Sequence, residues 1–451
     1  MNAPLGYRLV RGFTRLLAEI FYRRVEVVGG ERIPDGPLIV VANHQNALVD
    51  PLLLVAALPR QLRPIAKRPL FRILPLRPLL RLAGAIPVER QQEAGGDPQR
   101  NAAMFAAVGA ALAHGEAILI FPEGVSHTGT TLQPLRTGAA RILLSAAVDQ
   151  GLRPALLPVG LVFREPGTLR GGWAALQIGV PIPTDDLREL AASDPATAVR
   201  RLTERIAAGL RRQLVELDDW QTARLLCVAE RVWRDEVGAI APGSERLAWM
   251  RQVAHAYREL LAREPERLLR LREQLERYAA TLSGLGLTGG ELQSEYPARL
   301  VLAYAAREGG VLLLGLPLAL AGLALHGLPY LATATVVHLA RPEPDVLATA
   351  KLGTGIVAYP LLWAAEAWLA WRLAGGWGLA ALLVALLPAG FAALAWRERL
   401  ERARRAARGF LTGLRRPGLR RLLLAERRAL GEELRALAAL VPAPTAREGA
   451  P

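Results

Sequence analysis

The 451-residue sequence predicts an α/β domain, followed by a helical region and by apolar helices that enter a membrane. We expect the α/β domain to hold a mixed, mostly parallel sheet flanked by helices. Two observations predict this order. Short β-rich runs alternate with helical patterns from residue 24 to about residue 220, as in parallel strands joined by crossover helices. Beyond residue 308, charges become rare over stretches longer than the ~20 residues that a bilayer crossing needs.

Seven runs in the first region predict strands, and the patterns between them predict covering helices. The strands are expected at Val25–Val28, Leu38–Ala42, Leu62–Ala66, Ala85–Val88, Ala117–Phe121, Ala155–Phe163 and Ala174–Val180. The helices are expected at Pro51–Leu58, Pro98–His114 and Arg136–Val148, with a longer one at Pro195–Leu217. We therefore place the α/β domain at residues 24–220.

Residues 1–23 predict an amphipathic helix. At 100° per residue, Arg8, Arg11 and Arg15 fall on one side, and apolar residues such as Leu9 and Phe13 cover the other. Such a helix is suited to the bilayer interface, although packing on the core of its own domain is the alternative. Its apolar residues never run together, so the segment does not predict a signal peptide.

Residues 221–305 lose the strand signal, and Ser244–Leu260 and Pro265–Leu282 predict an antiparallel helical pair. The segment Gly284-Leu-Gly-Leu-Thr-Gly289 has the spacing of a dinucleotide-binding fingerprint. It follows a helix instead of a strand, so we interpret it as a helix end and linker.

Residues 306–396 predict membrane-embedded helices. Residues 309–340 contain no Asp, Glu, Lys or Arg, and two further apolar stretches run over 352–371 and 373–396. We expect the last two stretches to cross the bilayer, with a turn at Arg372–Gly376 between them.

The basic flanks of these stretches set the expected orientation. Residues 397–451 begin with an arginine-rich run and predict a basic helical tail. Short basic flanks stay on the cytosolic side, and we place residues 1–305 there too. Both ends inside require an even number of crossings, so residues 309–340 are expected to be shallow or re-entrant, broken near Pro317 or Pro329.

The charge balance favours an anionic partner. The net charge is +15, from 56 Lys and Arg against 41 Asp and Glu. Zinc-finger spacings and basic heptads are absent from the sequence, so a nucleic acid is not predicted and a phospholipid surface is. A GC-rich genome would also enrich arginine over lysine. The single cysteine, Cys227, excludes disulfides and cysteine-pair metal sites, which fits a reducing, cytosolic location.

The strongest chemical signal is the pair His44 and Asp50, directly after the predicted strand Leu38–Ala42. Ligands of α/β folds bind beyond the carboxyl ends of strands. An imidazole is suited to general-base catalysis near neutral pH, and a carboxylate can orient it. On one continuous helix the two residues would lie ~240° apart. They meet only if His44 lies in a loop and a helix begins near Asp50–Pro51, where Asp50 could also be a helix cap.

Two further signals follow later strands. Gly84 precedes the predicted strand Ala85–Val88, and Arg90 follows it. A guanidinium beyond the end of a strand can bind a phosphate bidentately. An exposed arginine after a strand is equally common, so this signal is weak alone. The turn Phe-Pro-Glu123-Gly124 follows a buried strand, where the glycine can present backbone amides to an anion. Glu123 could accept hydrogen bonds from substrate hydroxyls, or it could bind and orient Arg90.

Two weaker candidates complete the set. Arg136 precedes a predicted helix and could add a second phosphate contact at its N-terminus. Pro158, in the apolar strand Ala155–Phe163, could line a pocket for an apolar chain or could simply be part of the core.

Four of these segments, in this order, resemble the glycerolipid (phospholipid/glycerol) acyltransferase superfamily over roughly residues 20–220. They are the His44–Asp50 segment, the strand between Gly84 and Arg90, the Phe-Pro-Glu-Gly turn and the strand that contains Pro158. The resemblance implies that His44 deprotonates the acceptor hydroxyl, which attacks the thioester of acyl-CoA or acyl-carrier protein, while Asp50 orients His44. It implies that no other cofactor and no metal is needed. The expected substrate-binding residues are Asn43, Gly84, Arg90, Glu123, Gly124 and Arg136, and the expected acyl-pocket residue is Pro158.

The resemblance also suggests an acceptor. Five residues separate His44 from Asp50, whereas the commoner family motif has four. The longer spacing resembles a branch that acylates glycerol 3-phosphate or dihydroxyacetone phosphate at the start of phosphatidic acid synthesis. Acylation of 1-acylglycerol 3-phosphate is the alternative. The expected location is the cytosolic face of the cytoplasmic membrane.

Two other classes of protein fit less well. A lipid-cleaving serine hydrolase needs Gly-x-Ser-x-Gly, and the segment Gly124-Val-Ser-His-Thr-Gly129 has the wrong spacing. A non-catalytic membrane scaffold would leave the clustering of His44, Asp50, Arg90 and Glu123 at strand ends unexplained.

Overall fold

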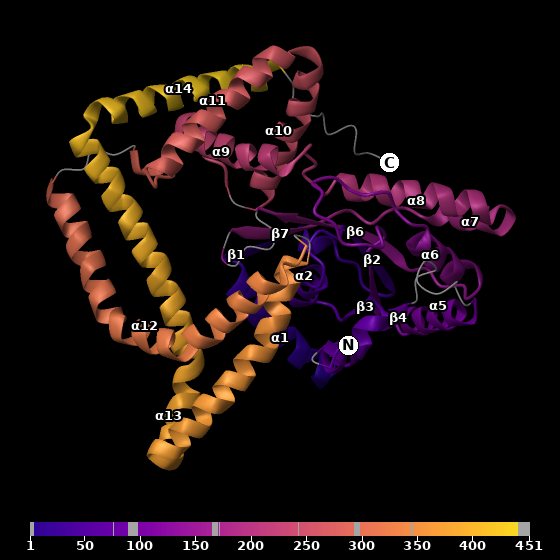
Figure 1. The fold of residues 1–451 in the computed structure, drawn as a ribbon. Coiled ribbons are helices and arrows are strands. Elements are labelled where there is room, and N and C mark those ends of the chain that lie inside the picture. Colours follow the sequence, from indigo (N-terminus) through magenta and orange to yellow (C-terminus); the bar gives the residue numbers. More distant parts are fainter. Residues whose placement is uncertain are drawn as a thin grey trace. The chain divides into compact units, whose positions relative to one another are not determined.

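The computed structural model describes residues 4–74, 76–88, 98–164, 170, 172–241, 243–292, 298–343 and 346–440. The chain divides into two compact units. The sheet unit comprises residues 1–223, 241–251 and 342–350, and the helical unit comprises residues 224–240, 252–341 and 351–451. Figure 1 shows the elements of both.

The sheet unit contains a seven-stranded sheet in the order β1-β7-β6-β2-β5-β3-β4. Its strands are β1 (Arg24–Val28), β2 (Leu38–Ala42), β3 (Leu62–Lys67), β4 (Ile86–Val88), β5 (Ala117–Ile120), β6 (Ala155–Phe163) and β7 (Trp173–Ile178). Neighbouring strands pair in parallel except β6 and β7, which are antiparallel. This is the mixed, mostly parallel sheet predicted from the alternating pattern, and all seven strands fall on the predicted runs. Strand β2 lies centrally, and its five residues are all buried.

Helices cover the sheet and join its parallel strands. They are α1 (Leu5–Phe21), α2 (Val49–Ala57), α3 (Leu76–Leu82), α5 (Pro98–Ala113), α6 (Gly138–Val148), α7 (Asp185–Ser193) and α8 (Pro195–Arg211). One hydrophobic cluster joins β2, β5 and β6 to α5, α6, α7 and α8, and it includes Ile39, Val41 and Ile118. Because strand side chains alternate between faces, Ile39 and Val41 point to these helices together. This packing holds β2 and β5 in place, and with them the loops that follow their carboxyl ends.

Helix α1 packs against its own unit. Val10 and Phe21 are buried, and Arg15 Nε donates a 2.9 Å hydrogen bond to the carbonyl oxygen of Ala56 at the end of α2. Arg15 belongs to the arginine face that the sequence analysis placed at the membrane surface. It instead helps to cap α2, because a cation near a helix C-terminus is stabilising. Leu5 and Leu9 remain 67% and 63% exposed, so a membrane contact through these two side chains stays a prediction.

The helical unit has its own core. Its helices are α9 (Trp220–Glu236), α10 (Ser244–Arg263), α11 (Pro265–Gly284), α12 (Ala298–Ala340), α13 (Leu347–Arg415) and α14 (Pro417–Leu440), of which α9, α10 and α13 begin in the sheet unit. Leu271 and Leu275 of α11 share a hydrophobic cluster with Leu423 and Leu430 of α14. The described part of the expected basic tail thus packs with the region predicted at 221–305.

Helices α12 and α13 are long and apolar enough to cross a membrane. Their apolar side chains are largely exposed, for example Leu314 and Val384, and such surfaces indicate membrane association. Helix α13 is broken by non-helical backbone at Ala374 and Gly375, within the turn predicted from the sequence. In Figure 1 its two halves form a hairpin.

Helix α12 is one continuous helix, although Pro317 and Pro329 lie inside it. Figure 1 shows it bending along its length, as expected where proline removes a backbone donor. It packs antiparallel to the second half of α13: Glu308 forms a bidentate ion pair with Arg399 at 2.6 and 3.0 Å. His326 Nε2 lies 2.8 Å from the carbonyl oxygen of Leu386.

Candidate active site

The His44 side chain lies in the loop between β2 and α2, beyond the carboxyl end of the central strand. Its Nδ1 is 2.9 Å from Asp50 Oδ2. The Asp50 side chain is fully buried, whereas that of His44 is 18% exposed. The sequence-based expectation that a loop brings these two residues together is met by this geometry.

The Asp50 carboxylate organises the loop as well as the imidazole. Helix α2 begins at Val49, slightly earlier than expected. Asp50 Oδ2 accepts a 2.8 Å hydrogen bond from the backbone N–H of Asn46, which lies upstream, so the structure does not use Asp50 as the helix cap. Burial raises the pKa of Asp50 above its ordinary value of 3.8, and the hydrogen bond with His44 opposes that rise.

Because a carboxylate accepts the bond, the proton of a neutral His44 lies on Nδ1, and Nε2 keeps its lone pair. The ring of His44 is stacked on Phe121, with the ring centroids 4.2 Å apart. An oriented, partly exposed imidazole of this kind can take a proton from a hydroxyl.

Glu123 connects the histidine loop to the Phe-Pro-Glu-Gly turn. Its Oε1 accepts a 2.7 Å hydrogen bond from the backbone N–H of His44. Its Oε2 accepts from the backbone N–H of Gln133 at 2.9 Å and lies 2.5 Å from His127 Nε2. The side chain is fully buried. Both oxygens are therefore engaged in holding backbone, which favours positioning over the substrate contact expected from the sequence.

Gly124 has the backbone conformation that its place in the motif suggested. Its φ of +74° lies in the left-handed region, which side chains with a Cβ rarely adopt. A Cβ built there would lie 2.8 Å from Arg136 Cδ. The backbone N–H of Arg136 also donates a 2.8 Å hydrogen bond to the carbonyl oxygen of Pro122. The absence of a side chain at Gly124 thus lets the exposed Arg136 lie across the turn.

Two expected binding residues have other roles. The Asn43 side chain is buried and exchanges two hydrogen bonds with the Leu161 backbone, at 3.0 and 2.7 Å, which ties β2 to β6. Gly84 precedes β4, at the amino end of a strand that runs parallel to β3. It therefore lies at the opposite edge of the sheet from His44, where its carbonyl oxygen accepts a 2.8 Å hydrogen bond from Arg63. Neither position supports a contact with substrate at His44.

Two more candidates stay predictions. Arg90 lies outside the described residues. Pro158 is buried in β6 opposite Val41, and ideal Cβ atoms built at Gly179 and Gly209 would come 2.9 and 3.6 Å from its ring. This places Pro158 in the layer between the sheet and α8, where the plain-core alternative also fits.

The structure adds residues that the sequence analysis did not assign. His127 follows Glu123 of the Phe-Pro-Glu-Gly turn by four residues, and this spacing could have indicated that the two side chains meet. Thr349 had no such signal: its Oγ1 accepts a 2.9 Å hydrogen bond from the backbone N–H of Leu48. The connection between α12 and α13, at residues 342–350, thus contacts the histidine loop within the sheet unit.

The chain's similarity to known proteins agrees with this site. Residues 24–162 match the family model described as Acyltransferase, a range that includes His44, Asp50, Glu123 and Arg136. The sheet unit therefore contains a region that is similar to the acyltransferase family model.

Individual relatives are distant. An uncharacterized acyltransferase of Schizosaccharomyces pombe is 25% identical over 64% of this chain and 55% of its own length. Glycerol-3-phosphate O-acyltransferase 1 of Saccharomyces cerevisiae is 31% identical over 29% of this chain and 18% of its own. Glycerol-3-phosphate O-acyltransferase 2 of the same yeast is 27% identical over 37% and 22%. The chain thus spans about half the length of the first relative and about a fifth of the other two.

One solved structure is similar in part. The crystal structure of the 1-acyl-sn-glycerophosphate acyltransferase from Thermotoga maritima covers 44% of this chain and 79% of its own, with 23% identity and a TM-score of 0.32.

Proposed function

We propose that this chain is an O-acyltransferase that moves a fatty acyl group from a thioester donor to a hydroxyl of a glycerol phosphate. The observation that carries the proposal is the bond between His44 Nδ1 and Asp50 Oδ2, at the end of β2. It lies in the part of the chain that matches the acyltransferase family model.

In the proposed reaction, the lone pair on His44 Nε2 accepts the proton of the acceptor hydroxyl. The hydroxyl oxygen attacks the thioester carbonyl carbon, and a tetrahedral intermediate forms. Collapse of the intermediate breaks the C–S bond, and His44 returns the proton to the leaving thiolate. Asp50 stabilises the imidazolium that exists between the two transfers. The donor is acyl-CoA or acyl-carrier protein, and no metal takes part.

Acceptor binding is assigned to the turn beside His44. Gly124 leaves room for Arg136, whose guanidinium can hold a phosphate, because paired N–H donors match phosphate oxygens. Arg90 remains a candidate for a second phosphate contact. Glu123 is assigned to positioning, since its oxygens bond the backbone of His44 and Gln133.

Glycerol 3-phosphate or dihydroxyacetone phosphate is the preferred acceptor. The five-residue spacing from His44 to Asp50 and the similarity to two yeast glycerol-3-phosphate O-acyltransferases support it. The second candidate is 1-acylglycerol 3-phosphate, which carries the same phosphate and a free hydroxyl.

The site is proposed to face the cytosol at the cytoplasmic membrane. Residues 241–251 and 342–350 both belong to the sheet unit, so they lie on one side of the bilayer. Helix α12 is the only candidate span between them in the described residues. It therefore enters and leaves on the same side, which supports the re-entrant arrangement. The hairpin of α13 then supplies two crossings.

The test is turnover of the purified full-length protein with radiolabelled acyl-CoA. Glycerol 3-phosphate, dihydroxyacetone phosphate and 1-acylglycerol 3-phosphate are offered separately at equal concentration. Labelled lysophosphatidate from glycerol 3-phosphate supports the preferred acceptor, and labelled phosphatidate from 1-acylglycerol 3-phosphate alone supports the second candidate. If none of the three is acylated by acyl-CoA or by acyl-carrier protein, the proposal is wrong.

A further inference from the structure

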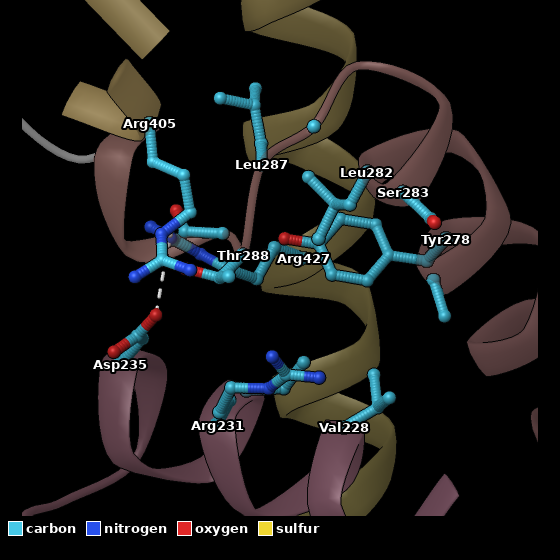
Figure 2. Close-up of a pocket in the computed structure, with 14 residues that line it drawn as sticks. Val228, Arg231, Asp235, Tyr278, Leu282, Ser283, Leu287, Thr288, Arg405 and Arg427 are labelled. Atoms are coloured by element: carbon cyan, nitrogen blue, oxygen red, sulfur yellow. Dashed lines mark hydrogen bonds and ion pairs between the residues drawn. The ribbon is translucent and has the colours of Figure 1, made fainter. Parts of the chain in front are cut away.

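A cavity of about 310 Å³ lies in the helical unit, far along the chain from the histidine loop. Helices α9, α11, α13 and α14 and the loop after α11 form its walls (Figure 2). The loop contains Gly286 and Gly289, part of the glycine-rich segment that the sequence analysis interpreted as a linker. Its polar lining includes Arg231, Arg405 and Arg427.

The arginines bring guanidinium groups to this cavity. The Arg427 side chain is buried and bonds Glu236 Oε1 at 2.6 Å and Asp235 Oδ2 at 3.4 Å. Arg405 interacts electrostatically with Glu291, so carboxylates offset much of the arginine charge. The N–H groups of a guanidinium can donate in pairs to the oxygens of an anion such as a phosphate. The hydrogen-bond donors of the cavity therefore suit an anionic ligand.

Tyr278 supplies a second, independent indication of a ligand. Its side chain is 2% exposed, and its hydroxyl has no hydrogen-bond partner. Figure 2 shows the ring reaching from α11 toward Arg427. A buried hydroxyl without a partner is costly. Burial raises its pKa to about 12, so the hydroxyl keeps its proton and can donate to an acceptor oxygen of a ligand.

The position of Arg405 on α13 indicates where the ligand comes from. It follows Trp396, the last residue of the apolar stretch, by nine residues on one continuous helix. At a rise of 1.5 Å per residue this is about 13 Å beyond the apolar stretch. The headgroup layer extends roughly 5–7 Å beyond the hydrocarbon core, and an arginine side chain can span the remainder. Leu282 and Leu287 add apolar wall beside the charges.

We propose that this cavity binds the phosphate group of an anionic glycerophospholipid, at a second site separate from the catalytic histidine. Arg405 contacts the phosphate, and the Tyr278 hydroxyl donates to one of its oxygens. Free inorganic phosphate offers the same chemistry and is the other possible source.

Binding is tested without turnover, so failure of this proposal is distinct from failure of the acyltransferase proposal. The full chain, in neutral detergent, is titrated with short-chain phosphatidylglycerol, short-chain phosphatidylcholine or inorganic phosphate, and thermal unfolding is followed. The variants are Arg405→Gln and Tyr278→Phe. Arg404→Gln is the matched control, because Arg404 is the exposed neighbour of Arg405 and does not line the cavity.

We expect saturable stabilisation of the parent by phosphatidylglycerol and none by phosphatidylcholine. Arg405→Gln should weaken binding at least about tenfold, as loss of one charge-assisted hydrogen bond does, and Arg404→Gln should not. Tyr278→Phe should raise the melting temperature without ligand, since it removes the unpartnered hydroxyl, and should reduce the shift with ligand.

Other results overturn the proposal in whole or in part. Stabilisation by inorganic phosphate that needs Arg405, without a further effect of phosphatidylglycerol, would overturn the lipid source and leave a phosphate site. Equal losses in Arg404→Gln and Arg405→Gln, or no saturable effect of either anion, would overturn the site itself.

Discussion

The backbone N–H of His44 donates a 2.7 Å hydrogen bond to Glu123 Oε1, across 79 residues of sequence. This bond joins the loop after β2 to the turn after β5, two adjacent parallel strands. Because parallel strands end at the same edge of a sheet, a carboxylate after one can hold the backbone after the other. The position of the proposed base therefore depends on Glu123.

Replacing Glu123→Gln should lower kcat about 10–100-fold and leave the KM for the acceptor nearly unchanged. The amide nitrogen of Gln would face a backbone N–H, which removes a hydrogen bond to a charged group. Steady-state kinetics measure both constants. The control is Glu116→Gln, because Glu116 pairs with Arg63 at 2.8 Å, at the opposite edge of the sheet. A higher acceptor KM with unchanged kcat would instead restore the substrate contact expected from the sequence.

Asp50→Asn should abolish most activity, because an amide does not hold the catalytic tautomer of His44. Its effect on stability should depend on pH. The pKa of Asp50 is raised in the folded protein, so the folded state holds this proton more tightly than the unfolded chain. The stabilisation that Asp50 gives the folded state is fully present below pH 3.8, and it is lost as the pH rises above that value.

The Asn variant has no such loss. Its melting temperature relative to the parent should therefore be higher at pH 7 than at pH 4, as thermal unfolding at the two values would measure. A relative stability that falls between pH 4 and pH 7 would show that ionised Asp50 is net stabilising.

Gly124→Ala should destabilise the protein by about 1–2 kcal/mol, because its φ of +74° is unfavourable for a residue with a Cβ. It should also raise the acceptor KM, since the new methyl group would displace Arg136. The control is Gly138→Ala at the start of α6, where a Cβ meets no atom within 4 Å. Unchanged stability and KM in Gly124→Ala would remove this turn from the acceptor site.

The proposed topology places the turn of α13 on the opposite side of the membrane from the sheet unit. With Cys227→Ser as background, Gly376→Cys should react with an impermeant thiol reagent added outside intact cells. Ala192→Cys, on the exposed surface of α7, should react only after the cells are opened. Protection of Gly376→Cys under both conditions would place the hairpin tip within the bilayer.

Local sequence patterns were sufficient to predict the sheet and the His44–Asp50 pair. Strands β2, β5 and β6 are apolar runs, and Pro51 indicated the helix start that lets His44 lie in a loop. Helices α3 and α7 were not predicted. Helix α3 has seven residues and α7 has nine, so each contains too few turns for a clear helical period.

The roles of Asn43, Gly84 and Glu123 depend on contacts between segments distant in sequence. Asn43 bonds Leu161, 118 residues away, and Glu123 bonds the His44 backbone. No spacing rule identifies such partners. The amino-edge position of Gly84 was in principle available, because a residue before a parallel strand lies opposite the site at the strand ends.

The most direct test of the central claim is the turnover of His44→Ala with radiolabelled acyl-CoA and the acceptor that the parent uses. His114→Ala is the matched control, because His114 is exposed at the end of α5. Thermal unfolding checks that both variants fold. The account predicts that His44→Ala loses about 10²–10⁴-fold in kcat, whereas His114→Ala keeps the parent rate. Near-normal turnover by folded His44→Ala would contradict the assignment of His44 as the general base.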